Sequence, residues 1–524
     1  MKVLLVNPSW GSRVAGRRYN RAWPPLDLLY TAARLRKLGF EVDLCDARAS
    51  GITPEAASPM FTDADLVVAG TSPLDRWQCP NLDLRPLLRW TRMIPPEKLL
   101  ICGVHGTLYP DSILAMTSAK AVVRGEPEET VPALCSALAG SRPSLAEVAS
   151  VSYRNGDTVF HNPPSLPVDL SMLPQPAYDL TVPGDYEYEL LGRNMAVLET
   201  ARGCPHACAF CLKAMYGKGI RRKPIGRVLE EVRQVRSQGY SKVYFIDLEF
   251  CLDRKRTVEL CAGLRDAGIS WCCQTRVDDV DPGLLREMAA SGCRLIHYGI
   301  ESGAPAIRER IRKNITSTQT ENAIHWTRSA GIATAGFFLT GFRGESPGDW
   351  LETEKLARKL NPTYASFHRV TPYPRTGRGA SRTKPWWENA GELSARDNRI
   401  KRAYLRYYLR PSYVAEFLRN GNVSFAPIRL FLSFLKGTLS DVSREATPGQ
   451  QWRRLPVRLI QAVDRITSTV LRWRRHGMRG ASLPTMPSMP TITSAPPVKR
   501  SELCSGSDLI PAGSNGLKPG APPR

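Results

Sequence analysis

The first 140 residues alternate short apolar runs with longer amphipathic segments. Val3 to Val6 has the uninterrupted apolar character of a buried strand, and Leu26 to Leu38 repeats apolar positions at helical spacing until Gly39. Further apolar runs predict strands at Glu41–Leu44, Leu66–Ala69, Leu99–Cys102 and Ala121–Val123, with helices between them. Such alternation indicates a doubly wound α/β domain, a parallel sheet with helices on both faces. Ligands of such sheets bind at the carboxyl ends of the strands.

A second run of strand–helix units occupies residues 191–375. Six apolar segments predict parallel strands at Met195–Glu199, Lys242–Ile246, Ser270–Gln274, Arg294–Gly299, Ala333–Leu339 and Tyr364–Val370. Six units in order favour a partial (β/α)6 barrel, in which active residues lie at the carboxyl ends of the strands. The Pro-rich residues 141–190 are predicted to be a linker, with a short hairpin at Asn155-Gly156.

The pattern changes beyond residue 375. Residues 376–480 are predicted to be helical, and residues 452–475 repeat apolar positions at three- and four-residue spacing among many Arg residues. Residues 481–524 are rich in Pro, Ser, Thr and Gly, which predicts a disordered tail. A chain of 524 residues is therefore expected to hold roughly two or three domains.

The charge of the chain bears on its partners. The net charge of +23 suits nucleic acid, an anionic membrane or anionic small molecules, although much of it is spread as single Arg residues. No helix-turn-helix, zinc-finger or RNA-binding signature accompanies it, so nucleic acid is not an expected partner. The basic segment 452–475 could give peripheral contact with an anionic membrane, or it could pack on the barrel with a solvated Arg face, which we favour.

The expected compartment follows from two absences in the sequence. No secretory signal precedes the first strand, and no uncharged stretch approaches the roughly 20 residues of a membrane span. The 13 cysteines form no short disulfide framework. A reducing cytoplasm is therefore expected, where cysteines serve metals or packing. Packing is the expected role of those in apolar segments, namely Cys251, Cys272, Cys273 and Cys293.

Three cysteines lie close together just after the first strand of the second run. Cys204, Cys208 and Cys211 form a Cys-x3-Cys-x2-Cys pattern. Thiolates are the usual ligands of Fe–S clusters, and three of them leave one iron of a 4Fe–4S cluster open to a chelating ligand. A structural zinc site would want a fourth protein ligand, for which His206 is awkwardly spaced. A chance grouping of cysteines is the other alternative, and the position after a strand argues against it.

The segment Thr200-Ala-Arg-Gly-Cys-Pro-His-Ala-Cys-Ala-Phe-Cys211 resembles the signature of the radical S-adenosylmethionine (SAM) enzymes. Later strands resemble that family too, in the segments Tyr244–Phe250, Gln274–Asp278, His297–Gly303, Gly336–Gly341 and Thr371–Pro374. The resemblance covers roughly residues 190–375. It implies a 4Fe–4S cluster, SAM bound at the open iron, and a reductant such as flavodoxin or ferredoxin as partner.

The same resemblance implies roles by position. Arg276 and Glu301 would bind the polar end or the ribose of SAM, and Asp247 and Glu249 would lie close to SAM or substrate. Arg276 could instead pair with Asp278 or its neighbour on the surface, and Glu301 could cap the helix that follows it. We favour a cofactor role for Glu301 because it ends a predicted barrel strand.

Residues 1–140 resemble the cobalamin-binding domain that precedes the barrel in class B radical SAM enzymes, in the segments Pro24–Leu26, Gly39–Asp43, Gly103–Thr107 and Gly125–Thr130. The motif Asp-x-His-x-x-Gly, which places a histidine on cobalt, is absent, because glycine stands two residues before His105. The loops around Ser72 and His105 are expected to contact cobalamin, with a plain loop histidine as the equal alternative. A nucleotide site or a mere scaffold is the other reading, but neither common phosphate-binding glycine motif is present.

Together these resemblances imply a cobalamin-dependent radical SAM C-methyltransferase. In such enzymes a 5′-deoxyadenosyl radical removes hydrogen from an unreactive carbon, and methylcobalamin supplies the methyl group. The expected substrate is a small molecule, either a natural product or, given the segments Phe425–Leu435 and 452–475, a lipid-like compound. The alternatives are a radical SAM cyclase or rearrangement enzyme of the same architecture, and a non-catalytic cobalamin or Fe–S sensor.

Overall fold

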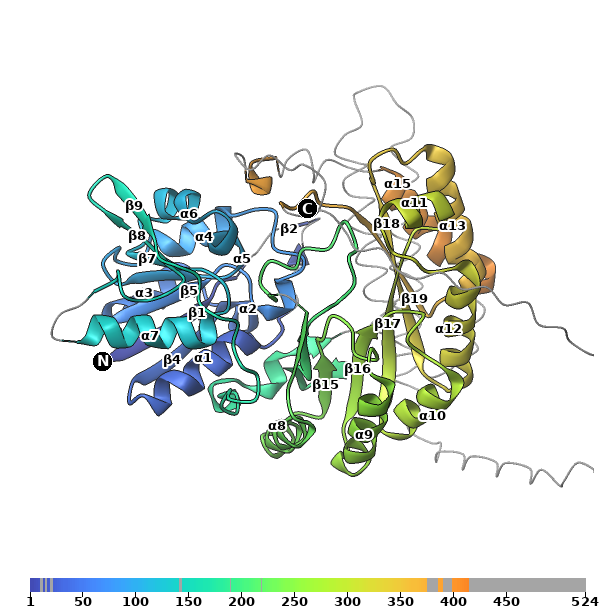
Figure 1. Cartoon of the computed structure of the whole chain (residues 1–524), viewed down its shortest axis with the longest axis horizontal. Helices are drawn as coiled ribbons and strands as arrows, with labels where there is room; N and C mark the ends of the chain where they lie inside the picture. The colour runs from blue at the N-terminus through green and yellow to red at the C-terminus, as the bar shows by residue number, and fades with distance from the viewer. Residues whose placement is uncertain are drawn as a thin grey trace, which may run out of the picture. The chain divides into compact units, whose positions relative to one another are not determined.

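The computed structural model describes residues 1–9, 13–14, 17–18, 22–140, 144–188, 190–217, 219–374, 385–389 and 398–413. Two α/β assemblies make up this part of the chain, each built on a mainly parallel sheet (Figure 1). The segments Phe425–Leu435 and 452–475, the tail 481–524 and most of the predicted helical region 376–480 lie outside the described residues. Every helix in the described ranges is too short or too polar to span a lipid bilayer.

The first assembly contains the predicted doubly wound sheet. Its strand order is β4-β1-β5-β6-β7-β8-β9, with the first five strands parallel and β8 and β9 paired as an antiparallel hairpin. The bounds are β1 Lys2–Asn7, β4 Glu41–Asp46, β5 Leu66–Gly70, β6 Leu99–Cys102, β7 Ala121–Val123, β8 Val151–Asn155 and β9 Thr158–His161. The predicted strands and the hairpin are confirmed, and the hairpin extends this sheet. The domain boundaries stay predictions.

Helices cover both faces of the first sheet, which is why its strands are apolar at successive positions. Val3 and Leu5 are buried with α1 and α7, while Leu4 and Val6 are buried with α3, α4 and α6. The predicted helix after residue 25 is confirmed, and it ends one residue before Leu38. The bounds are α1 Leu26–Lys37, α2 Ala47–Ser50, α3 Pro54–Asp63, α4 Arg85–Thr91, α5 Val104–Leu108, α6 Pro110–Thr117 and α7 Pro127–Ala139.

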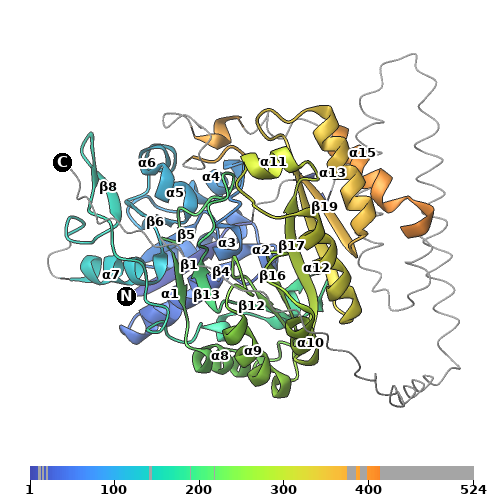
Figure 2. The ribbon, with the colours of Figure 1, turned by 45° about the vertical axis from the view of Figure 1, so that its right-hand side comes forward.

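The second assembly is an open sheet of six parallel strands in chain order, as the partial barrel predicts (Figure 2). All six predicted strands are confirmed, with β12 and β19 at the two edges. The bounds are β12 Met195–Leu198, β15 Lys242–Phe245, β16 Ser270–Thr275, β17 Cys293–Glu301, β18 Ala333–Thr340 and β19 Tyr364–Arg369. Because all strands are parallel, their carboxyl ends meet at one edge, where the loops of a barrel carry its active residues.

Five helices follow the strands of the second sheet and cover its outer face (Figure 1). They are α8 Ile225–Ser237, α9 Arg254–Leu264, α10 Pro282–Ala290, α12 Ser317–Ser329 and α13 Pro347–Leu360. Beyond them, α15 (Asn398–Tyr408) packs on β19, where Ala365 N donates to Tyr408 Oη at 2.9 Å. The helical structure predicted for residues 376–480 is therefore confirmed over Asn398–Tyr408.

The remaining elements are short. Antiparallel pairs join β2 (Arg13–Val14) to β3 (Arg17–Arg18), β10 (Glu187–Tyr188) to β11 (Gly192–Arg193), and β13 (Ala201–Gly203) to β14 (Ile220–Arg222). The short helices are α11 Pro305–Arg310, η1 Leu74–Arg76, η2 Tyr178–Leu180, η3 Pro183–Asp185, η4 Arg265–Ala267 and η5 Trp386–Asn389. The pair β13–β14 matters for the site, because the three clustered cysteines follow β13 directly.

A buried ion pair of the second assembly is hydrogen-bonded to a tyrosine of the first. Lys223 Nζ lies 2.8 Å from Glu231 Oε1, and both side chains are 1% exposed. Tyr30 of α1 donates its hydroxyl hydrogen to Glu231 at 3.0 Å and accepts a hydrogen bond from Lys223. Charged groups taken out of water are costly unless they are paired and hydrogen-bonded, so each of these three groups depends on the other two.

Replacing Lys223 by methionine would leave Glu231 buried without its cation. We expect Lys223→Met to lower the free energy of unfolding by about 3–5 kcal/mol, measured by urea denaturation of the full chain. Lys223→Met combined with Glu231→Leu should recover most of that loss. Arg89→Met, which removes an exposed pair with Glu55, should have a much smaller effect. An equally mild effect of Lys223→Met would show that the buried pair does not stabilise the fold.

Candidate functional site

The three clustered cysteines lie on one half-buried loop after β13. Lys213 donates to the carbonyl oxygens of Cys204, at 3.2 Å, and His206, which folds the loop around a single ammonium group. Ala209 N donates to Ile311 O at 2.9 Å and fixes the loop to the segment that follows α11. A short backbone contact, Cys211 N to Cys208 O at 3.3 Å, turns the chain between the last two cysteines.

The thiols of this loop influence one another's pKa through electrostatic interactions. Burial raises the pKa of Cys211 to about 12, with smaller contributions from Cys208, Cys79 and Cys204, and burial also raises the pKa of Cys204. Thiolates in such surroundings need a strong positive partner, which a metal centre provides. Every cysteine in the described part of the chain is a free thiol. Three free thiols on one short loop fit an iron–sulfur cluster with one iron left open.

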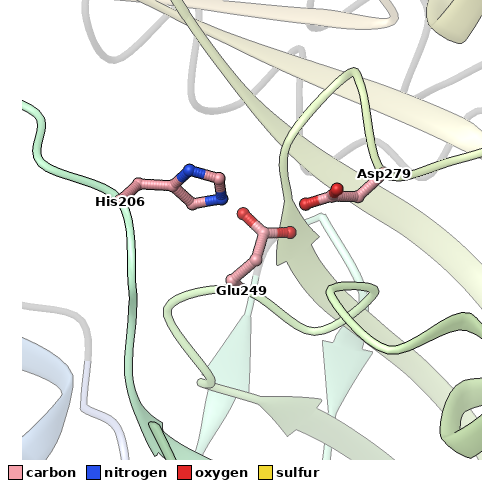
Figure 3. A group of neighbouring side chains, drawn as sticks. All are labelled: His206, Glu249 and Asp279. Atoms are coloured by element: carbon pink, nitrogen blue, oxygen red, sulfur yellow. The ribbon is translucent and has the colours of Figure 1, made fainter. Parts of the chain in front are cut away.

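His206 faces two carboxyl groups that follow neighbouring strands. Its imidazole faces the carboxyl groups of Glu249, after β15, and Asp279, after β16 (Figure 3). One ligand atom from each of the three residues lies within 4.8 Å of the other two. Within the described residues, His206 Nε2 and Asp279 Oδ2 are buried and have no hydrogen-bond partner. With Nε2 of His206 unprotonated, all three residues present acceptor atoms, so the group is suited to receive an amino group or a cation.

Glu249 is the fixed member of this group. Its Oε1 accepts from the backbone N of Arg276 at 2.8 Å and from the hydroxyl of Thr275. The carboxyl is buried, and burial raises the pKa of Glu249 to about 8. Burial also raises the pKa of Asp279, with a further contribution from the charge of Asp278. Two carboxyl groups lie close together here, so an incoming donor or cation would be attracted to them.

Arg276 and Glu301 lie in one hydrogen-bonded chain at the ends of β16 and β17. Arg276 grips Asp278 with two bonds of 2.8 Å and also donates to Lys313 O at 2.9 Å. Lys313 Nζ in turn lies 3.2 Å from Glu301 Oε1, with both side chains 8% exposed. The pairing with Asp278 is as expected, but the guanidinium is buried instead of lying on the surface.

The backbone at Glu301 is strained. Its φ is +67°, a conformation that costs a non-glycine residue energy and is concentrated at functional sites. A register irregularity between Gly299 and Glu301 accompanies it in the β17–β18 pairing. The alternative role as a helix cap is wrong, because α11 begins after Ala304 and has no side-chain cap. Glu301 is held inward, toward Lys313, at the carboxyl end of its strand.

Asp247 acts on the segment that leads into the cysteine loop. One carboxyl oxygen accepts from the backbone N of Thr200 at 2.7 Å, and the other accepts from the Thr200 hydroxyl at 2.5 Å. Burial raises the pKa of Asp247 to about 6. Both oxygens are thus occupied by the residue four positions before Cys204, and a direct contact with SAM stays a prediction for this residue.

The first sheet presents small residues where its strands end. Gly103 has a φ of +104°, and a Cβ there would lie 2.6 Å from Thr71 Oγ1 and 2.9 Å from Ser72 N. Only glycine therefore permits this approach of the two loops. Thr71 Oγ1 is buried without a hydrogen-bond partner among the described residues. A close backbone cradle with an unsatisfied hydroxyl fits a ligand at this edge of the sheet.

His105 is enclosed by aromatic rings. Its Nδ1 lies 3.2 Å from Ser72 Oγ, its Nε2 lies 2.9 Å from Asn81 O, and its ring is 5.0 and 5.3 Å from the rings of Trp386 and Trp387. Burial lowers the pKa of His105 to about 4, so the imidazole is neutral at pH 7. Ser72 and His105 lie in contact at this edge of the sheet. A contact of either with cobalamin stays a prediction.

The loop after β5 extends from the first sheet to the cysteine loop. The ring of Trp77 meets that of Tyr216 edge-on, with the centroids 5.6 Å apart. Tyr373, which follows β19, donates its hydroxyl hydrogen to Pro80 O at 3.2 Å. The carboxyl ends of the two sheets are therefore linked through one loop, which lies against the cysteine-bearing segment of the barrel.

Comparison with known proteins identifies the family. The sequence profile of the radical SAM superfamily matches residues 198–357. An uncharacterized methyltransferase of Pyrococcus horikoshii is 31% identical over 72% of this chain and 82% of its own length. The anaerobic magnesium-protoporphyrin IX monomethyl ester cyclase of Rubrivivax gelatinosus is 28% identical over 71% of this chain and 68% of its own length.

Solved structures show the same fold. The radical SAM methyltransferase TsrM of Kitasatospora setae, solved with cobalamin and a [4Fe-4S] cluster, matches with a TM-score of 0.59 and 20% identity. The match covers 72% of this chain and 77% of that one, so it extends over both α/β assemblies. The chain therefore belongs to the radical SAM superfamily of enzymes, and it has the fold of the cobalamin-dependent, methyltransferase-like members.

Proposed function

We propose that this enzyme is a cobalamin-dependent radical SAM C-methyltransferase that acts on an unreactive carbon of a small molecule. The observation that supports this most is the link between the two sheets. The loop after β5, which belongs to the cobalamin-like edge, packs on the cysteine loop through Trp77 and Tyr216. Two cofactors held at those edges would face one space, as transfer between them and a shared substrate requires.

Three thiols and three acceptors would hold the cluster and SAM. Cys204, Cys208 and Cys211 would ligate the cluster, and the acceptor group of Glu249, Asp279 and His206 would receive the amino group of SAM. When bound, the cluster, SAM and cobalamin supply single-electron cleavage, hydrogen removal from carbon and a transferable methyl group. The protein positions these groups and excludes water from them.

The hydrogen-bonded group of Arg276, Lys313 and Glu301 would bind the rest of SAM. Glu301 offers a buried carboxylate, suited to ribose hydroxyl groups, and Lys313 beside it offers a buried ammonium, suited to a carboxylate. Arg276 fixes Lys313 by donating a hydrogen bond to its backbone oxygen. Asp247 would act through Thr200, by holding the entry to the cysteine loop.

Cobalamin would lie at the edge formed by Thr71, Ser72 and Gly103. His105 is neutral, enclosed by tryptophan and hydrogen-bonded to Ser72 in this loop. We therefore do not propose His105 as a ligand of cobalt. The TsrM structure holds cobalamin in a chain of the same fold. An oxygen-sensitive cluster also suits the reducing cytoplasm and a low-potential reductant such as flavodoxin or ferredoxin.

The second candidate is oxidative cyclisation without methyl transfer, and the similarity to magnesium-protoporphyrin ester cyclases favours it. The methyltransferase-named relative at higher identity favours the first candidate. Membership of an enzyme superfamily argues against a purely sensory role. Peripheral membrane contact and a lipid-like substrate rest on residues 425–475, outside the described part of the chain, and stay predictions.

Iron content tests the cluster ligands. We expect about four irons per chain after anaerobic reconstitution, and a loss of most of that iron in Cys204→Ala, Cys208→Ala and Cys211→Ala. Cys251→Ala, a buried thiol in the barrel core, should keep the iron and the cluster absorbance. Full iron retention in any of the three alanine variants would remove that residue from the ligand set.

Gly103→Ala tests the cobalamin edge. The added methyl group would collide with Thr71 and Ser72 in a backbone conformation that favours glycine, so cobalamin affinity should fall roughly tenfold or more. Gly140→Ala, at the far end of α7 with only ordinary contacts, should bind cobalamin normally. Iron content checks that the barrel has folded in both variants. Unchanged cobalamin affinity in a folded Gly103→Ala protein would contradict the assignment.

Labelled SAM separates the two candidate reactions. The reconstituted enzyme, with cobalamin, a reductant and SAM carrying a deuterated methyl group, is incubated with a small-molecule extract and the products are analysed by mass spectrometry. We expect one product to gain the labelled methyl group, and to be absent with Cys208→Ala. A product that has lost two hydrogens and carries no label, formed together with 5′-deoxyadenosine, would establish the cyclase candidate instead.

A further inference from the structure

The last two barrel strands expose part of their inner face. In the pairing of β18 with β19, Phe337 lies beside Ser366 and Leu339 lies beside His368. The residues between them, Phe338 and Phe367, point the other way and are buried, at 0% and 2% exposure. Phe337, Leu339 and Ser366 are only half-buried, and His368 is exposed. The inner face of β18 and β19 is therefore accessible, whereas their outer face is covered by helices.

This exposed face adjoins the proposed SAM site. Gly299 pairs with Phe337 across β17 and β18. A Cβ on Gly299 would lie 2.5 Å from Glu301 Oε1 and 2.9 Å from Lys313 Nζ, so only a glycine fits there. Because Gly299 has no side chain, nothing at that position separates Glu301 and Lys313 from Phe337. A molecule resting on β18 and β19 would lie next to the groups proposed to bind SAM.

The ring of Phe337 is supported from one side. It stacks on His297 with the centroids 5.6 Å apart and the planes 29° apart. His297 is buried and held by the Tyr188 hydroxyl at 2.8 Å, and its ring meets Tyr244 edge-on at 5.4 Å. A ring fixed in this way loses little freedom when a second flat surface stacks on its open parts.

Polar groups lie on the β19 side of the ring. His368 Nε2 and Ser366 Oγ are 2.6 Å apart, so the imidazole and the hydroxyl orient each other. The centroids of His368 and Phe337 are 6.4 Å apart. The nearby charges of Glu301 and Lys313 are already paired, so the face itself offers a ring, an aliphatic side chain, a hydroxyl and an imidazole.

We propose that this face, made of Phe337, Leu339, Ser366 and His368, binds the substrate, and that the substrate is a flat aromatic or conjugated ring system with a hydrogen-bonding group. The ring stacks against Phe337, and its polar group meets His368 and Ser366. The inference rests on the proposed function, since it places the substrate beside SAM. A saturated lipid-like chain would gain contact area on Leu339 but no stacking, so the face favours a flat ring.

A matched pair of probes tests this proposal on the full-length, reconstituted enzyme with SAM bound. Naphthalene-2-carboxamide is flat and aromatic, and its decahydro derivative has the same carbon framework and amide but is saturated. We expect the aromatic probe to bind roughly fivefold more tightly by isothermal calorimetry, from the energy of one aromatic contact. Phe337→Leu should abolish that preference. Phe160→Leu, an exposed phenylalanine on β9, should keep it.

His368→Leu tests the hydrogen bond to the polar group of the substrate. His368→Leu should weaken binding of both amides roughly fivefold, by removal of one hydrogen bond, while the preference for the flat probe remains. SAM affinity and cluster absorbance should be unchanged in Phe337→Leu and His368→Leu. Equal binding of the two probes to the unsubstituted enzyme, or a preference that survives Phe337→Leu, would overturn the proposal.

Probe binding and SAM cleavage report separately on the substrate-binding face and on the reaction class. If SAM is cleaved to 5′-deoxyadenosine but the probes bind equally, the substrate-binding face is wrong and the reaction class stands. If the flat probe is preferred but SAM is never cleaved, the reaction class is wrong.

Discussion

A single buried guanidinium ties the cysteine loop to both sheets. Arg202, two residues before Cys204, is 0% exposed, and it contacts three carboxylates. Its Nη1 lies 3.1 Å from Glu126 and its Nη2 lies 2.9 Å from Glu128, both at the start of α7, while its Nε lies 3.0 Å from Glu199 after β12. A buried charge is tolerated only with such partners, so these contacts fix the end of one sheet against the other.

The charge balance of this contact is unusual. Three carboxyl groups surround one guanidinium, with Arg221 as a second cation on Glu126. Burial raises the pKa of Glu128 to about 8, the charge of Arg202 opposes that rise, and the neighbouring carboxylates add to it. The guanidinium also lies over the ring of Trp77, 5.1 Å from its centroid. The loop that carries Trp77 is thereby held against the cysteine loop, and the rest of the site depends on that contact.

The sequence predicts the parts of the molecule that depend on local pattern. Both sheets follow from apolar runs between amphipathic segments, because parallel strands buried on both faces have a recognisable composition. The three cysteines are found from their spacing alone. The contacts of Lys313 are not predictable, because it lies in an irregular segment after α11 with no motif. The direction of the His206 ring depends on residues that fold to it from β15 and β16 (Figure 3). The enclosure of His105 depends on Trp386, which is distant in sequence.

The central claim is that SAM binds at the open iron of a cluster on the Cys204–Cys211 loop. Electron paramagnetic resonance of the reduced, reconstituted protein tests it most directly, with spectra taken before and after addition of SAM. Binding of SAM at the open iron predicts a 4Fe–4S signal whose g-values shift when SAM is added, and no such signal in Cys208→Ala. A normal cluster signal that SAM leaves unchanged would contradict it.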